Sequence, residues 1–149
     1  MDSLYFAGII LLITVHGHKV VTLNADDIAC CNEYNVRITT FIQWFDKKLL
    51  LPEHDPLVNK FAKCWLNRRG YVNSDGVMNE SLYREWIRAT TFRGIDTKSL
   101  TEADLQNKER SIDAIIPFCK DHAKFSDDDD YRIIFYNCVA SKVYDIKQL

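Results

Sequence analysis

Apolar residues recur at every third or fourth position through most of the chain, the spacing that places side chains on one face of an α-helix. One apolar stripe runs through residues 39–51, and Pro52 ends it because proline cannot continue a helix. Another follows Asp55-Pro56, a capping residue and a first-turn proline, and stops at Gly70. We therefore expect helices over 39–51 and 55–70. The stripes comprise Phe41, Ile42, Phe45, Leu49 and Leu50, and then Leu57, Phe61, Cys64 and Trp65.

Capping signals mark the starts of the remaining helices. Asn24, followed by two acidic residues, caps a first helix, and Ser99 with Glu102 forms a capping box further along. Strand signals are weak, because glycine is scarce and no hairpin dipeptide lies between alternating segments. The sequence thus predicts an all-α fold, a compact bundle of about six helices. These helices are expected at 22–35, at 79–90, from Ser99 through Ile116, and from an acidic cap at 126–130 through Val143.

The N-terminal segment differs from the rest of the chain. Residues 4–15, LYFAGIILLITV, are apolar and uncharged, but they are too few to span a bilayer. The run resembles the apolar region of a secretory signal, with a small residue at Gly17 as a cleavage point, although Asp2 stands where a basic residue is usual. We expect a signal peptide over 1–17 and one secreted domain over 18–149. The alternative is a buried N-terminal helix.

Secretion changes the interpretation of the cysteines. The chain has 5 cysteines, and disulfides persist in an oxidising compartment. No Cys-x-x-Cys pair occurs and the histidines complete no metal site, so neither a metal nor a cofactor is expected. An odd count leaves one spare thiol, and the adjacent Cys30-Cys31 pair must supply it, because neighbouring cysteines rarely bond each other. Two disulfides are expected.

Composition and motifs exclude several classes of function. The formal net charge is −2, which gives no basic surface for nucleic acid. The chain lacks a Gly-x-Ser-x-Gly elbow, a His-Glu-x-x-His motif and a glycine-rich phosphate loop, so no enzyme activity is expected.

Three cysteine-containing stretches carry the most specific pattern. They are Cys30-x-x-Glu33-x-x-Val36, the segment FAKCWLNRRGYVNSDGVMNESL at 61–82, and the spacing of Cys119, Asp129 and Cys138. In this order they resemble the first-cysteine helix, the third-cysteine helix with its turn, and the last three cysteine positions of insect odorant-binding proteins. The resemblance covers residues 26–145.

The resemblance also implies a disulfide pattern. Lys60 and Asp129 stand where the family has its second and fifth cysteines, which bond each other, so both partners are absent together. Such a loss is similar to the C-minus subgroup of the family and to the D7 salivary proteins of blood-feeding insects. The disulfides implied are Cys30–Cys64 and Cys119–Cys138, with Cys31 as the spare thiol.

By this resemblance the helices surround an apolar cavity, and the protein is a secreted carrier of a small hydrophobic ligand such as an odorant, a pheromone or a lipid. Aromatic residues suit the walls of such a cavity, although each is also an ordinary core residue in the plainest interpretation. A receptor or a second copy of the chain is a further expected partner, and membrane insertion is not expected after signal cleavage. The expected ligand-binding residues are Phe41, Trp44, Phe45, Trp65, Tyr71, Trp86, Arg88, Phe118, Phe135 and Tyr136.

Two alternatives remain open. The first is a D7-like salivary or haemolymph scavenger of biogenic amines or eicosanoids, in which an amine would need a carboxylate such as Glu85 or Asp113. The second is a protein-binding module without a cavity.

Overall fold

The computed structural model describes residues 12–15, 19–124 and 128–148, with side chains for 23–124 and 130–147. Within these ranges six α-helices account for most of the chain, which confirms the predicted all-α class. A short 3-10 helix, Thr97–Ser99, precedes α5. The helices are α1 Ala25–Glu33, α2 Ile38–Trp44, α3 Pro56–Arg68, α4 Glu80–Phe92, α5 Glu102–Ala123 and α6 Asp128–Gln148.

Ahead of α1 the chain forms a short hairpin. Strand β1, Leu12–Val15, pairs antiparallel with β2, Lys19–Thr22. Residues 1–11 and 16–18 lie outside the described part of the chain, so the expected signal peptide is described only where it forms β1. Cleavage near Gly17 would remove β1 and leave every helix intact.

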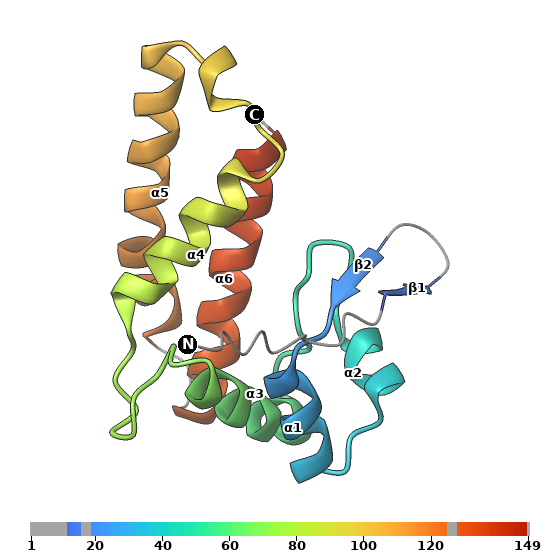
Figure 1. Ribbon diagram of the computed structural model, residues 1–149. Coiled ribbons are helices and arrows are strands. Elements are labelled where there is room, and N and C mark those ends of the chain that lie inside the picture. The colour runs from blue at the N-terminus through green and yellow to red at the C-terminus, as the bar shows by residue number, and fades with distance from the viewer. Residues whose placement is uncertain (1–11, 16–18, 125–127, 149) are drawn as a thin grey trace, which may run out of the picture.

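The helices pack around two clusters of buried side chains. Figure 1 shows α4, α5 and α6 side by side, with α3 lying across the lower end of α6 and α1 beside α3. One cluster joins α1, α2 and α3, and the other joins α4 and α5. Helix α6 belongs to both, because Tyr136 and Ala140 are buried in the first cluster while Phe135 and Val139 are buried in the second. It is therefore the central helix of the fold.

Two of the predicted helix starts are confirmed by their caps. The Asn24 side chain accepts hydrogen bonds from the first turn of α1, and the Asp27 carboxylate accepts one from the Asn24 backbone N–H. The Asp55 side chain accepts from Leu57 and Val58 at the start of α3. At α5 the capping box expected at Ser99 and Glu102 is wrong. The box is formed by Thr101 and Asp104, and the cap expected at Ser126 lies outside the described residues.

The helix expected over 39–51 ends early, at Trp44. The side chain of Asp46 accepts hydrogen bonds from the backbone N–H groups of Lys48 and Leu50, at 2.7 Å and 2.9 Å. These local bonds satisfy the backbone in a turn and so compete with the helix. Leu49 takes a positive φ of 65° in this turn. The turn places Leu49 at the surface, where it is 47% exposed, rather than in a buried helical stripe.

Both implied disulfides are confirmed. Cys30–Cys64 joins α1 to α3, and Cys119–Cys138 joins α5 to α6. Cys31 is the free thiol and is buried. The resemblance places Lys60 and Asp129 where the odorant-binding family has a further disulfide. The Asp129 side chain lies outside the described residues, but the neighbouring side chains of Asn59 and Asp130 are hydrogen bonded at 2.6 Å. Helices α3 and α6 are therefore adjacent at that point.

Replacing Cys119 and Cys138 together by alanine is expected to lower the free energy of unfolding by about 3 kcal/mol. The disulfide limits the freedom of the unfolded chain, and its loss releases that restraint. Urea unfolding followed by circular dichroism measures the change. A double variant that unfolds at the same urea concentration as the unmodified protein would contradict the expectation.

Candidate ligand-binding site

A pocket of about 330 Å³ lies where the two clusters meet. It opens to the surface and is lined by side chains from α1, α2, α3, α4 and α6 and from the segments between them. It combines rings with charged groups, so it is less apolar than the cavity that the resemblance implied. The lining residues are Asp27, Phe41, Phe45, Leu49, Trp65, Leu66, Arg69, Tyr71, Tyr83, Trp86, Arg93 and Tyr136.

Tyr136 stands at the centre of the aromatic wall. Its ring meets Trp65 edge to face with centroids 5.5 Å apart, and it stacks on Trp86 at 6.2 Å. Trp65 and Trp86 each pack against both clusters, so this trio closes the junction between them. Burial raises the pKa of the Tyr136 and Tyr83 hydroxyls, which therefore remain neutral at physiological pH.

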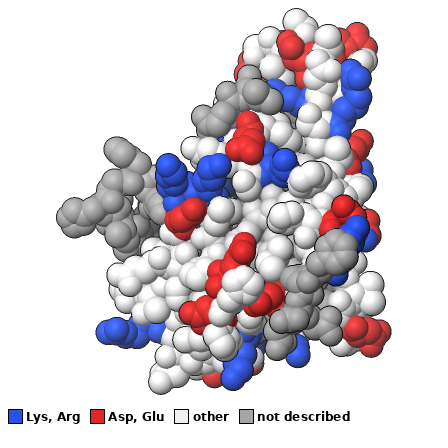
Figure 2. All heavy atoms as spheres, turned by 180° about the vertical axis from the view of Figure 1, so that it is seen from behind, with Lys and Arg blue, Asp and Glu red and all other residues white. Residues whose placement is uncertain are grey.

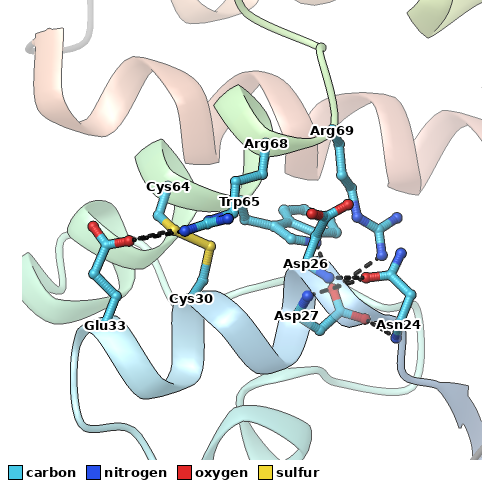
Figure 3. Close-up of a disulfide and its surroundings, with 9 residues drawn as sticks. All are labelled: Asn24, Asp26, Asp27, Cys30, Glu33, Cys64, Trp65, Arg68 and Arg69. Carbon is cyan, nitrogen blue, oxygen red and sulfur yellow. Dashed lines mark hydrogen bonds and ion pairs between the residues drawn. A yellow bond between two sulfur atoms is a disulfide. The ribbon is translucent and has the colours of Figure 1, made fainter. Parts of the chain in front are cut away.

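The carboxylate of Asp27 lines the pocket and is buried. Figure 3 shows it with Asn24, Trp65 and Arg69. The Asp27 side chain is 4% exposed, and its Oδ1 accepts hydrogen bonds from Trp65 Nε1 at 2.7 Å and Arg69 Nη2 at 2.9 Å. Its Oδ2 accepts from the Asn24 backbone at 2.8 Å. Both oxygens are thus engaged, as a buried charge requires. The Arg69 guanidinium also lies 4.8 Å from the Trp65 ring centroid, so one side chain fixes both the carboxylate and the ring.

The segment between α2 and α3 forms another wall and is bonded to α6. The buried side chain of Asn137 accepts from the Leu51 N–H and donates to the Leu51 carbonyl, each at 2.8 Å. Tyr136 donates its hydroxyl to the Leu49 carbonyl at 3.1 Å. These bonds hold Leu49 beside the rings of the pocket.

Six of the ten expected ligand-binding residues line this pocket, and four do not. Trp44 packs edge-on against Phe41, and Phe135 lines a separate cavity between α6 and the 72–78 turn. Arg88 pairs with Glu109, whereas Phe118 is 52% exposed. The six are Phe41, Phe45, Trp65, Tyr71, Trp86 and Tyr136.

The carboxylates proposed for an amine ligand also lie elsewhere. Asp113 pairs with Arg84, and Glu85 is exposed; neither lines the pocket. The sequence interpretation instead missed Asp27, whose place in the first turn of α1 already has a local explanation as a capping acid. One signal pointed to burial: Asp27 shares a helix face with Cys30 and Cys31, three and four residues on.

No protein-family model, no curated protein and no solved structure matches this chain.

Figure 2 shows basic and acidic side chains interspersed with uncharged surface on the face opposite that of Figure 1. In the described part of the chain, no helix has the length and apolarity to cross a membrane. Among the same residues, no three His, Cys, Asp or Glu side chains are placed to hold a metal ion.

Replacing Asp27 by asparagine is expected to lower the free energy of unfolding by about 3 kcal/mol, because Arg69 then loses its buried counter-charge. Asp26 on the same turn is the matched control: asparagine there removes only a favourable interaction with the helix dipole, worth under about 1 kcal/mol. Urea unfolding of both variants measures the difference. Equal losses in the two variants would contradict the assigned role of Asp27.

The Cys31 thiol is expected to react with a disulfide reagent at least about 100-fold more slowly in the native protein than in denaturant. It is 2% exposed, and burial together with the nearby Asp27 charge raises its pKa, so little thiolate is accessible. Spectrophotometric thiol titration at mildly alkaline pH measures the rate. Rapid native labelling, or a disulfide-linked dimer on a non-reducing gel, would show that this burial is wrong.

Proposed function

We propose that this protein is a secreted extracellular carrier that binds a small hydrophobic or amphipathic ligand in the pocket between its two clusters, and that it is an odorant-binding-protein-like member of the C-minus or D7 type. The observation that carries the proposal is the pocket of about 330 Å³ with aromatic rings contributed by α2, α3, α4 and α6. Its size lies at the lower end of the range for small-molecule sites. The ligand would be held by exclusion of water from its apolar part.

Two sequence features support the proposal alongside the pocket. The apolar run at 4–15 has the character of a secretory signal, and two disulfides suit an oxidising compartment. The resemblance of residues 61–82 to odorant-binding proteins, which are carriers of small ligands, also supports the proposal.

The amine-scavenger alternative is less well supported by the pocket. An amine needs a carboxylate with free acceptor capacity, and the pocket's Asp27 is already bonded to Trp65, Arg69 and the Asn24 backbone. A protein-binding module without a cavity would leave the pocket without a role.

Trp86→Ala is expected to weaken binding of the fluorescent probe N-phenyl-1-naphthylamine about tenfold, because Trp86 lines the pocket and its ring supplies contact area. Trp44→Ala is the matched control: Trp44 is also a partly buried tryptophan, but it packs on Phe41 and Phe61 and does not line this pocket. Fluorescence titration of the purified mature protein gives both affinities.

Trp44→Ala is expected to bind the probe within about twofold of the unmodified protein, which shows that any loss at Trp86 is local. Absence of probe binding by the unmodified protein would overturn the carrier proposal. Equal weakening in both variants would place the bound probe outside this pocket.

A further inference from the structure

A second hollow adjoins the pocket on the far side of its wall. It has a volume of about 160 Å³ and shares Leu49, Trp86 and Tyr136 with the pocket. Beyond this shared wall its floor is apolar and comes from Ala140 and Val143 of α6. The same three side chains therefore separate the two hollows, and they are in contact with both.

Three lysines line this second hollow: Lys47 and Lys48 from the segment after α2, and Lys147 from the end of α6. We call it the lysine slot. Lys47 and Lys147 make no ion pair with any described residue. Lys48 lies 3.6 Å from Asp145, whose side chain is 57% exposed, so this ion pair is weak and exchangeable.

The carboxylates near the lysine slot do not cancel its charge. Asp145 offsets Lys48, and Asp46 uses one oxygen to accept from two backbone N–H groups of its own turn. The lysines still outnumber the two carboxylates. One neutral group is also unsatisfied there: the Thr90 hydroxyl lines the slot, is buried, and has no hydrogen-bond partner among the described residues. The slot thus offers an apolar floor and positive charge.

The shared wall has one part that is free of helical restraint. Trp86 and Tyr136 belong to α4 and α6, whereas Leu49 lies in the turn after α2 and is 47% exposed. Its carbonyl is held by Tyr136, but its side chain is not enclosed. Exposed side chains change rotamer on a picosecond-to-nanosecond timescale, so Leu49 is the part of the shared wall that can move aside.

We propose that the pocket and the lysine slot form one continuous site for a single-chain amphiphile with a carboxylate head. The apolar chain lies among the rings of the pocket, passes Leu49, and places its head against Lys47, Lys48 and Lys147. This inference rests on the proposed carrier function and names the class of ligand for the same site. Coulomb attraction to the lysines supplies selection for an anionic head, and the rings supply selection for an apolar chain.

Displacement of bound N-phenyl-1-naphthylamine by dodecanoate and by dodecan-1-ol tests the proposal, because the two competitors share a chain and differ in charge. At low salt, the unmodified protein is expected to bind dodecanoate about tenfold more tightly than dodecan-1-ol. The triple variant Lys47→Gln, Lys48→Gln, Lys147→Gln is expected to lose this preference while binding dodecan-1-ol unchanged. Unchanged dodecan-1-ol binding also shows that the variant is folded.

A matched control removes the same charge elsewhere: Lys60→Gln, Lys63→Gln, Lys98→Gln changes three exposed lysines outside both hollows. It is expected to keep the preference for dodecanoate, which separates a local effect from the change in net charge. Acetate is expected not to displace the probe, since the head alone lacks the chain.

Each other outcome overturns a defined part of the proposal. Equal affinity of the unmodified protein for dodecanoate and dodecan-1-ol refutes the head-group site and leaves the carrier function standing. A preference that survives in the triple variant but disappears in Arg93→Gln places the head in the pocket and refutes the lysine slot. Displacement of the probe by acetate refutes the requirement for an apolar chain. Failure of the probe to bind refutes the carrier function itself.

Discussion

The buried carboxylate of Asp27 restricts how α1 and α3 can pack. Removing one partner of a buried ion pair typically costs about 3–5 kcal/mol, so Asp27 and Arg69 must stay together wherever α1 lies. The Trp65 N–H bonds the same oxygen, and the Cys30–Cys64 disulfide joins the two helices next to this contact. Helix α1 consequently cannot slide along α3, and the Trp65 ring is held at one orientation in the pocket wall.

Polar bonds also define the opposite wall. The segment 46–51 has no helical hydrogen bonds to fix it, and Asn137 replaces them by pairing with both backbone groups of Leu51. A side chain that bonds a backbone in this way must be close to it and correctly turned, so Asn137, together with the Tyr136 hydroxyl on the Leu49 carbonyl, fixes the turn against α6. The pocket can therefore remain open between these walls, because their positions are set by directional bonds as well as by close packing.

Local patterns in the sequence predicted the elements well where the stabilising interaction is local. Asn24 and Asp55 cap their helices through residues two or three positions away, and both starts are confirmed. Asp46 shows the opposite case: the apolar stripe around it favours a helix, while its own side chain satisfies a turn. The site was less predictable, because which aromatic rings meet depends on tertiary packing. Phe118 was expected in the site as an aromatic residue, but it lies off the helical stripe of buried residues on α5 and faces outward at 52% exposure.

The positions of the two disulfides are consistent with a pocket at the junction of the two clusters. Cys30–Cys64 lies within the first cluster and Cys119–Cys138 within the second, so neither disulfide crosses between them. The clusters are joined instead by the two buried faces of α6 and by Trp65 and Trp86, which pack against both clusters. Unfilled space is least costly where the neighbouring elements are stabilised independently, because each cluster keeps its own packing when the space between them changes.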